Sequence, residues 1–479
     1  MARINTNVGA IVAQRHLNAG YRALNSTLQR LSSGLRITRG ADDPAGLIVS
    51  ERLRSEVRAV SQAIENTQRA SNIIATAEGA LNEVAALLND IQDLIVEAAN
   101  RGALSDDEIA ANQLQVDSAI ESITRIANST TFAGRKLLDG SLDYVTSGVN
   151  PNVVTTLQIQ GAQFGSRSFI PVNVNVLQSA QPAALYFANS SLTQPVVVEI
   201  KGNIGAASIG WPSGTAASAI VDSVNTISDS TGVVARFINT SNQASGVVLE
   251  SQLLGSRQFA SVVPLSGNLN FSFTETAGAN DFIKRDEGRD ATGLINGAAT
   301  IGDGNDLALR SSTLSLDLSL ATNFGLGTTS FAITEGGALF QVGPQVTSTL
   351  QVNLGIPSVA ASRLGNAVIG FLTQIKSDGP HALTKNGSAQ AQKIVSEALK
   401  QVSVLRGRLG AFEKNTLDTN VNQLGITMEN LMAAESNIRD ADFAFETSKL
   451  ARDQILIQAG TSVLAIANQT PQTVLRLLG

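Results

Sequence analysis

The stretch LSSGLRITRGADDPAGL, residues 31–47, separates two segments with helical periodicity. Asp43 is of a residue type that caps helix N-termini, and Pro44 suits the first helical position, so a helix is expected to begin there. Gly34 and Gly40 permit the backbone turns that end the preceding helix. The stretch therefore predicts a joint between two helices, made by Gly34, Gly40, Asp42, Asp43 and Pro44.

The helices flanking this joint are expected over residues 3–35 and about 44–100, and a last helix over about 436–467. Apolar residues recur there in alternating steps of three and four, which indicates long helices packed nearly parallel, as in coiled coils and bundles. One step is five residues long, from Phe412 to Leu417. The predicted stripes are Leu17, Tyr21, Leu24, Leu28, Leu31 and Leu35; Ile73, Ala77, Ala80, Val84, Leu87, Ile91, Leu94 and Ala98; Ile109, Gln113, Val116, Ile120, Ile123 and Ala127; Val395, Ala398, Val402, Leu405, Leu409 and Phe412; Leu417, Val421, Leu424, Met428 and Leu431; and Ile438, Ala441, Phe445, Ser448, Ile455, Ala459, Ser462 and Ile466.

The middle of the chain, about 140–385, differs from both ends in composition, because it is rich in Gly, Ser, Thr, Val and Asn. Alternating runs there predict strands near residues 157–160, 195–200, 233–237 and 313–320. The predicted fold class is α+β: long coiled-coil-like helices from both termini form an elongated helical core, and a β-rich middle insertion forms one or two outer domains.

Composition excludes several classes of function. The net charge is −6 and both signs are mixed along the chain, so the sequence does not indicate a basic surface that would bind nucleic acid or anionic lipid. Absence of cysteine removes thiolate chemistry, and two histidines leave little for metal binding or acid–base work. Neither an apolar run of about 18 residues nor the apolar region of a signal peptide occurs, so these signals alone predict a chain without a membrane span that stays inside the cell. No cofactor, metal site or catalytic residue is expected.

Two local features contain residue types used in metal binding or catalysis. IGDGNDLALR, residues 301–310, clusters acids with glycine but lacks EF-hand ligand spacing, so a turn is expected. A Ser–Lys hydrolase is not excluded by residue counts, yet no motif places such a pair.

The terminal stripes are narrow, which argues against an ordinary helical bundle with a β insertion. Thin apolar stripes offset little of the entropy lost on ordering the ends, so these ends are expected to be largely disordered alone and to fold against copies of themselves.

Several motifs closely resemble bacterial flagellin. At the N-terminal end they are RINTNVGAIVAQRHLN, LQRLSSGLRITRGADDPAGLIVSERLRSE and TTFAGRKLLDG, and at the C-terminal end residues 429–479. Residues 221–251 look like the β-rich IN repeat of flagellins and hook-associated proteins. The resemblance covers about half the chain and is highly specific.

This resemblance implies a filament subunit and overturns the expected location. Flagellins leave the cell through a type III apparatus without a cleaved signal and polymerise into the extracellular filament. The implied partners are other copies of the chain, an export chaperone, and cap and hook-associated proteins, with no nucleic acid or membrane partner. The implied domains are 1–43 with 436–479 as the inner core, 44–180 with 336–435 as an outer tube with β-hairpins, and 181–335 as the variable surface, with an IN-type repeat at about 196–263.

The expected filament-core interface comes from the terminal stripes, and the joint would link inner and outer tubes. Small residues in the stripes would make sliding between packings easy. The interface residues are Ile4, Ile11, Leu17, Tyr21, Leu24, Leu28, Leu31, Leu35, Ile438, Phe445, Ile455 and Ile466.

Residues 88–100 align with the stretch of many flagellins that vertebrate Toll-like receptors recognise. Recognised members carry arginines where this chain has Asp90 and Gln92, so weak receptor activation is expected, because an acid repels an acidic partner and the bidentate donor is lost. Filament packing explains these positions equally well. The stretch comprises Asn89, Asp90, Gln92, Asp93, Leu94 and Glu97.

Two rival functions stay open at this point. A hook–filament junction protein shares both terminal motifs, although the full ADDPAGL joint and the TPQTVLRLLG end favour flagellin. A secreted adhesin or surface hydrolase would need a functional pocket in residues 141–385.

Overall fold

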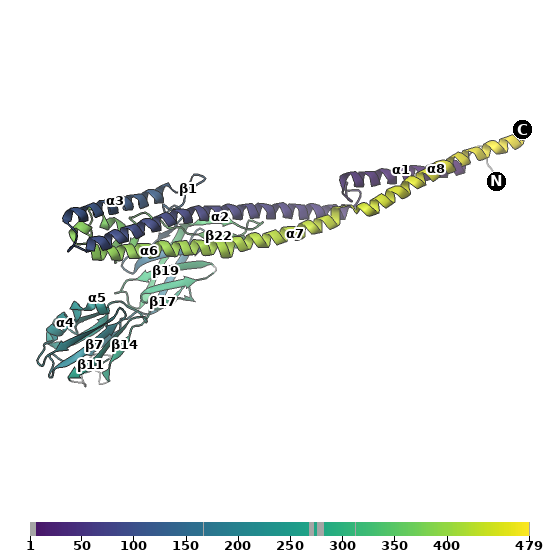
Figure 1. Cartoon of the computed structure of the whole chain (residues 1–479). Helices are drawn as coiled ribbons and strands as arrows, with labels where there is room; N and C mark the ends of the chain where they lie inside the picture. The colour runs from purple at the N-terminus through teal and green to yellow at the C-terminus, as the bar shows by residue number, and fades with distance from the viewer. Residues whose placement is uncertain (1–5, 166, 268–272, 275–281, 312, 479) are drawn as a thin grey trace. The chain divides into compact units, whose positions relative to one another are not determined.

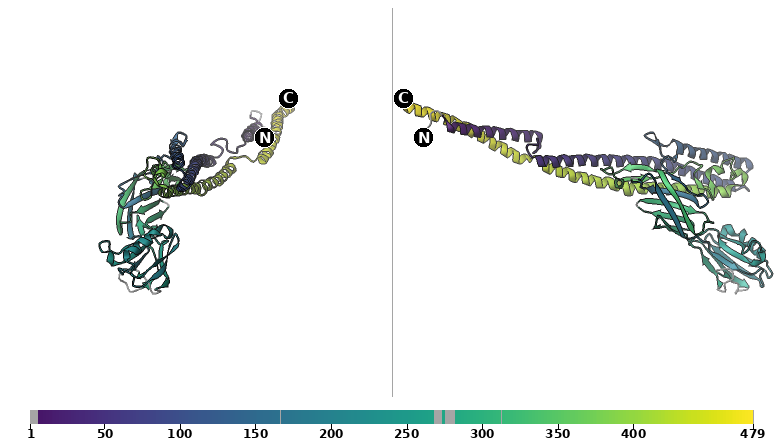
Figure 2. Two further views of the ribbon diagram at one scale, coloured as in Figure 1. Left: turned by 60° about the vertical axis from the view of Figure 1, so that its left-hand side comes forward. Right: turned by 180° about the vertical axis from the view of Figure 1, so that it is seen from behind.

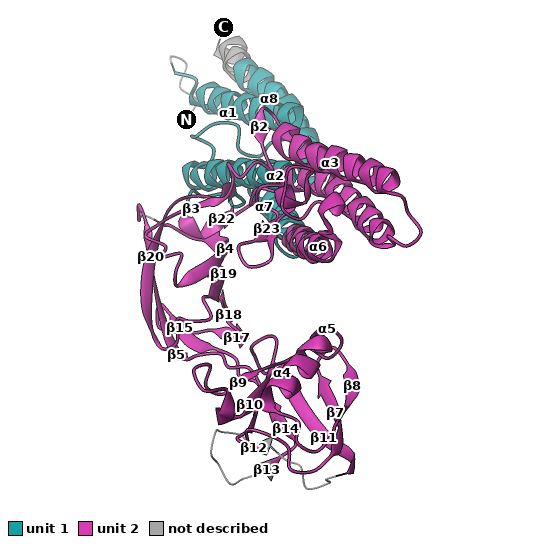
Figure 3. Ribbon diagram, turned by 90° about the vertical axis from the view of Figure 1, so that its left-hand side faces the viewer, with its two compact units in different colours: residues 1–69, 341–346, 414–479 teal, residues 70–340, 347–413 magenta. Residues whose placement is uncertain are grey.

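The computed structural model of the chain describes residues 6–165, 167–267, 273–274, 282–311 and 313–478. It contains two compact units (Figure 3). Unit 1 comprises residues 1–69, 341–346 and 414–479, and unit 2 comprises residues 70–340 and 347–413.

Helices from both ends of the chain build unit 1. They are α1 (Val8–Ser33), the beginning of α2 (Pro44–Ala99), α7 (Thr419–Arg439) and α8 (Phe443–Leu478). Figures 1 and 2 show α1 lying alongside α8 in every view. The beginning of α2 packs on α7 through a small core of Val60, Ala63 and Leu424, with Met428 and Leu431 at its margin.

The prediction of a single helix over about 436–467 is wrong, because the helical structure is interrupted between Arg439 and Phe443. The Asp442 carboxylate accepts hydrogen bonds from the backbone N–H of Ala444 (2.9 Å) and Phe445 (3.1 Å). This N-cap satisfies donors that a helix start would otherwise leave unpaired, so α8 begins anew.

The longest helix, α2, has a buried seam that differs in phase from the predicted stripe. Ile73, Ala80, Leu87 and Leu94 are only half-buried, whereas their neighbours Ile74, Leu81, Leu88 and Ile95 are buried. The buried positions repeat in steps of three and four through nearly six heptads, as close packing against other helices requires. They are Val60, Ala63, Thr67, Ala70, Ile74, Ala77, Leu81, Val84, Leu88, Ile91, Ile95 and Ala98.

In unit 2, α3 (Asp106–Ser129) and α6 (Ser388–Phe412) follow the predicted stripes closely. A capping box between Ser105 and Glu108 starts α3. All six residues of its stripe are buried, including Gln113, whose amide donates to the Ile375 carbonyl (3.0 Å) and accepts from Leu383 N–H (2.7 Å). After α6 the five-residue step coincides with a π-helix at Glu413–Asp418, whose wider turn accommodates one extra residue.

The middle of the chain forms two antiparallel β structures, both within unit 2. The first β domain has two sheets, with strand orders β16-β15-β5-β20-β3 and β17-β18-β19-β4. Side chains from both sheets, among them Val172, Val174, Leu307, Leu316 and Ile333, share one core. The strands are β3 (Tyr144–Ser147), β4 (Val154–Ala162), β5 (Ile170–Gln178), β15 (Thr292–Ile295), β16 (Ala298–Ala299), β17 (Ile301–Asp303), β18 (Asp306–Arg310), β19 (Leu314–Leu320) and β20 (Gly327–Gly336).

The second β domain is inserted between β5 and β15. Its sheets have orders β13-β12-β6-β10-β9 and β14-β11-β7-β8, and α4 (Ala217–Thr226) buries Ile220 and Val224 in their common core. The remaining elements are α5 (Ser228–Thr231), β6 (Ala184–Phe187), β7 (Val196–Gly202), β8 (Ala206–Trp211), β9 (Val233–Phe237), β10 (Val247–Ser251), β11 (Phe259–Gly267), β12 (Phe273–Thr274), β13 (Phe282–Ile283) and β14 (Arg285–Glu287).

The α+β prediction is confirmed, with long helices from both ends and antiparallel sheets in the middle. The four predicted runs lie in β4, β7, β9 and β19, and residues 304–305 form the expected turn between β17 and β18. Across the described part of the chain, no helix is long and apolar enough to cross a membrane. Short elements complete the fold: β1 (Thr131–Phe132), β2 (Arg135–Lys136), β21 (Ala338–Gln341), β22 (Gln351–Leu354), β23 (Gly365–Asn366), β24 (Gly370–Phe371), and 3-10 turns at Gln243–Ser245, Ser348–Leu350, Leu372–Ile375 and Leu383–Lys385.

Candidate assembly interface

The seam between α1 and α8 is antiparallel, and glycine on one helix faces a larger side chain on the other. A methyl group added at Gly20 would lie 3.3 Å from Ile457, and one added at Gly460 would lie 3.4 Å from Leu17, so the glycines let the two backbones approach closely. Near the other end, the Asn7 amide donates to the Ala467 carbonyl (2.8 Å). The residues facing inward on α8 follow a heptad rhythm: Glu446, Leu450, Asp453, Ile457, Gly460, Leu464 and Ala467.

Two acidic side chains are buried in this seam. Glu446 and Asp453 are each 3% exposed. The Arg30 Nη1 atom lies 3.1 Å from Glu446 Oε1, and the Thr27 hydroxyl donates to Asp453 Oδ2 at 3.5 Å. Counting apolar residues missed both acids, although their seven-residue separation was a usable signal.

Of the twelve predicted interface residues, six are exposed and face away from this seam, whereas Leu17 lies in it against Gly460. On α1, Ile11, Tyr21 and Leu28 are exposed, and Leu17, Leu24, Leu31 and Leu35 are half-buried, whereas Ile4 lies outside the described residues. On α8, Phe445, Ile455 and Ile466 are each more than 60% exposed, while Ile438, on α7, is half-buried. The paired helices therefore carry large apolar side chains on faces that their own chain does not cover.

The joint has two strands, and the sequence predicted only the first. Leu35 and Asp440 form an antiparallel bridge, in which Arg36 N–H donates to the Arg439 carbonyl (2.7 Å) and Ala441 N–H to the Gly34 carbonyl (2.9 Å). The break at 440–442 thus lies directly beside the break at 34–43. Gly34 ends α1 with φ of +72°, as predicted, whereas Gly40 is not among the glycines with positive φ.

Asp42 and Asp43 hold the turn before α2. The Asp42 carboxylate accepts from the Thr38 hydroxyl (2.8 Å) and from the N–H groups of Thr38 (3.1 Å) and Arg39 (2.9 Å), and the Thr38 hydroxyl bond contributes most to lowering the pKa of Asp42. Asp43 Oδ1 accepts from Gly46 N–H (2.9 Å), which confirms it as the cap of the helix beginning at Pro44.

Ile37 and Gly46 were missed as members of the joint. Ile37 is 2% exposed, and a methyl group added at Gly46 would lie 2.7 Å from its Cδ1 atom. The joint is therefore packed around the buried Ile37 side chain.

The predicted receptor stretch lies on α2. Asn89, Asp90, Asp93 and Glu97 are exposed, and Gln92 and Leu94 are half-buried. Asp90, Asp93 and Glu97 therefore form an exposed acidic row on α2.

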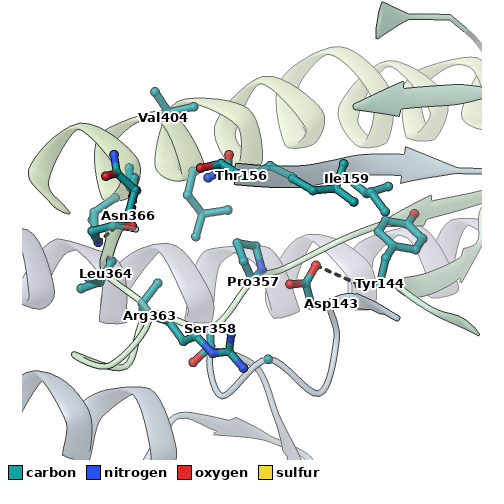
Figure 4. A pocket seen from close by; sticks show the side chains of 18 of the residues that line it. Asp143, Tyr144, Thr156, Ile159, Pro357, Ser358, Arg363, Leu364, Asn366 and Val404 are labelled. Carbon is teal, nitrogen blue, oxygen red and sulfur yellow. Dashed lines mark hydrogen bonds between the residues drawn. The ribbon is translucent and has the colours of Figure 1, made fainter. Parts of the chain in front are cut away.

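Unit 2 contains a cavity of about 630 Å³ between β3, β4, the 357–367 loop and α6 (Figure 4). Burial raises the pKa of Asp143 and raises that of Tyr144 to about 12, so the Tyr144 hydroxyl stays protonated at neutral pH. That hydroxyl accepts from Ala162 N–H (2.9 Å), and Asp143 accepts from Tyr144 N–H (2.8 Å). Arg408 donates to the Gly355 carbonyl. These groups serve neighbouring backbone atoms, and among described residues no cluster of three His, Cys, Asp or Glu side chains suits a metal ion.

Long helices from both chain ends, a two-stranded joint and uncovered apolar faces define a structural subunit of a helical assembly. Models described as the bacterial flagellin N-terminal and C-terminal helical regions match residues 4–143 and 392–478. B-type flagellin of Pseudomonas aeruginosa is 31% identical over 99% of both chains, and flagellin E of Vibrio cholerae is 31% identical over 99% of this chain and 98% of its own. A solved structure of FliC from Burkholderia pseudomallei is 19% identical, covers 72% of this chain and 98% of its own, and has a TM-score of 0.23. The chain belongs to the bacterial flagellin family, whose members are non-enzymatic structural subunits of the flagellar filament.

Proposed function

We propose that the chain polymerises through the apolar faces that α1 and α8 leave exposed. The observation that supports this proposal is the exposure of large apolar side chains on the faces of α1 and α8 that point away from the α1–α8 seam. The seam within the chain contains Ala13, Gly20, Thr27 and two acids beside a few larger residues such as Leu17 and Ile457, while many large apolar residues face outward. The outward residues are Val8, Ile11, Val12, Tyr21 and Leu28 on α1, and Phe443, Phe445, Ile455, Leu456 and Val463 on α8.

Burial of these faces supplies the driving force. Each large apolar side chain contributes about 1.5–3 kcal/mol when it leaves water, so a few of them per subunit supply several kcal/mol to association. Other copies of the chain present the same faces, and repeated contacts between identical subunits that do not close a ring generate a helical filament.

Seeded growth tests this function. Phe445→Ser and Ile455→Ser should abolish elongation of short filament seeds, measured by electron microscopy, whereas the control Leu326→Ser alters an exposed leucine in the first β domain and should grow like the unmodified chain. Unchanged growth of both α8 variants would refute the interface. Capping of seeds without elongation would favour the hook–filament junction function instead.

The domain organisation inferred from the sequence belongs to the same proposal. Residues 1–43 with 436–479 would form the filament core, 44–180 with 336–435 the surrounding tube, and 181–335 the surface. The paired joint would transmit load between the two layers, and its packed Ile37 and paired backbone strands support that role.

The proposal also includes the route by which the chain reaches the filament. The chain would be exported without a cleaved signal and with the help of an export chaperone. It would then assemble together with cap and hook-associated proteins. Terminal helices that fold only against neighbours suit passage through a narrow channel. Secretion assays in a strain with and without a functional type III export apparatus test this route, and secretion that persists without the apparatus would exclude it.

We also propose weak activation of the Toll-like receptor. Asp90 and Glu97 present negative charge on an exposed helix face, where an acidic partner would be repelled. Asp90→Arg should raise potency in reporter cells. Equal potency of the unmodified chain and an arginine-bearing flagellin would reject the proposal.

A further inference from the structure

The two β domains meet where the chain passes from one to the other and back. The outgoing connection lies between β5 and β6, and the returning one between β14 and β15. Gln181 and Arg289 form an antiparallel bridge between the connections, with two N–H···O bonds of 2.9 Å. The connections are therefore paired strands and not independent linkers.

Loops from both domains bind to this pair of strands. From the second domain, Gly255 N–H donates to the Gln181 carbonyl (3.2 Å), and the Gln258 carbonyl accepts from Gly288 N–H (2.9 Å). From the first domain, the β17–β18 turn contributes the Gly304 carbonyl, which accepts from Ala291 N–H (2.8 Å).

One carboxylate joins the two loops. Asp290 Oδ1 accepts from Ser256 N–H (2.8 Å) in the second domain and from Gly304 N–H (2.8 Å) in the first, and Oδ2 accepts from the Ser256 hydroxyl. Bonds to an ionised acceptor are stronger than neutral ones. Arg257 and Asp303 add an exposed ion pair (2.9 Å) between the same two loops. An ordinary turn-capping aspartate would serve one loop, whereas Asp290 serves one from each domain.

Glycines allow the backbones to cross at this point. A methyl group at Gly255, whose φ is +112°, would lie 2.7 Å from both Asp290 Oδ1 and Gly304 Cα. One at Gly302 would lie 1.9 Å from the Ala291 carbonyl oxygen, and one at Gly288 2.3 Å from that of Gly255. Side chains at these positions would force the strands apart.

We infer that Asp290 and the surrounding glycines form a clamp that couples the two β domains into one rigid arm. The IGDGN turn, whose acids resembled a calcium loop in the sequence, supplies the first-domain half of this clamp. The second domain is thereby held at a fixed orientation relative to the first, and does not swing on its two connections.

Spin labels test the coupling directly, because the chain has no cysteine of its own. Ser241→Cys labels an exposed loop of the second domain, and Asn323→Cys labels one of the first. In the unpolymerised full-length chain the label–label distance distribution should be narrow. Asp290→Ala should broaden it about twofold or more, since local structure opens when its bonds are lost. Asp290→Asn keeps an oxygen acceptor and should stay narrow, as should Asp222→Ala, a control at an exposed position of α4.

Hydrogen exchange provides a second measure that separates a clamp from general destabilisation. Asp290→Ala should accelerate exchange about tenfold or more at Ser256, Ala291 and Gly304, with strands β5 and β7 unchanged. A broad distribution in the unmodified chain, a narrow one in Asp290→Ala, or faster exchange throughout both cores would each overturn the inference.

Discussion

The packing of the joint predicts that a single methyl group at Gly46 loosens it. Gly46 lies in the first turn of α2, where alanine normally favours the helix by about 1 kcal/mol. Here the new Cβ atom would meet Asp43 Oδ2 at 2.4 Å and Ile37 Cδ1 at 2.7 Å. Both neighbours have to move, so the usual gain should reverse.

The expected cost follows from those two contacts. Displacing the Asp43 cap costs about 1 kcal/mol, and crowding buried Ile37 costs about 1–3 kcal/mol. Subtracting the helix gain leaves a net loss of about 1–3 kcal/mol, with a central value near 2. A loss of about 2 kcal/mol corresponds to a roughly 30-fold larger equilibrium constant for opening of the joint, and to exchange that is faster by the same factor where opening is a rapid pre-equilibrium.

Hydrogen exchange in assembled filaments measures this opening at the amides of Arg36 and Ala441, which donate across the joint. Gly79→Ala is the matched control, because it changes the same helix where an added methyl meets no atom of the chain within 4 Å. Gly46→Ala should exchange faster at both amides, and Gly79→Ala should not. If the two variants behave alike, the joint is not the packed structure inferred from Ile37 and Gly46.

Three further predictions concern charged and polar groups. Arg30→Gln should destabilise filaments by about 2–3 kcal/mol, more than Glu446→Gln, because losing the guanidinium leaves the buried carboxylate with only Lys449, whose Nζ atom lies 3.9 Å from Oε2, whereas the half-buried arginine still reaches water. Melting of the two variant filaments compares them, and equal losses would contradict the asymmetry. The hydrogen bonds that lower the pKa of Asp42 stabilise the joint at pH values above the ordinary aspartate pKa, and this stability should be lost as pH falls through the lowered pKa. Hydrogen exchange at the Arg36 amide should show this loss, and Asp42→Asn should remove the pH dependence. Tyr144 should ionise only near pH 12, so its contribution to stability is present below the pKa of the unfolded chain and is lost as pH rises through the pKa of the folded chain. Comparing the absorbance titrations of the unmodified chain and Tyr144→Phe isolates the ionisation of this residue. The same variant should lose about 1–3 kcal/mol of stability in urea unfolding, because Ala162 N–H loses its acceptor.

Sequence periodicity predicted the helices well but not always the face they bury. In α2, Leu87 and Leu88 are both apolar, as are Leu94 and Ile95, so spacing alone could not choose between two adjacent rows. Packing against neighbouring elements chooses the row of Leu88 and Ile95. The five-residue step before Leu417, by contrast, is a local property of one helix, and the structure places the π-helix there.

The α1–α8 seam was not predicted from the sequence, for a different physical reason. Counting apolar residues finds the most hydrophobic face, which on α8 includes Phe445 and Ile455. The seam within the chain forms where Gly20 and Gly460 let backbones approach, and it includes charged Glu446 and Asp453. The second break, at 440–442, was missed because it contains neither glycine nor proline and is defined by the Asp442 cap.

The outward-facing leucines, isoleucines and phenylalanines of α1 and α8 have a thermodynamic consequence. If their burial requires a second molecule, then ordering of the chain ends is a reaction of higher than first order, and its extent depends on protein concentration. A dilute solution would hold chains with folded β domains and open ends, and above a threshold concentration further protein would enter polymer while the free chain stays nearly constant. If the chain is exported before it polymerises, as proposed, the same relation makes the intracellular concentration of free chain the quantity to be limited, because these apolar faces would join copies to one another before export.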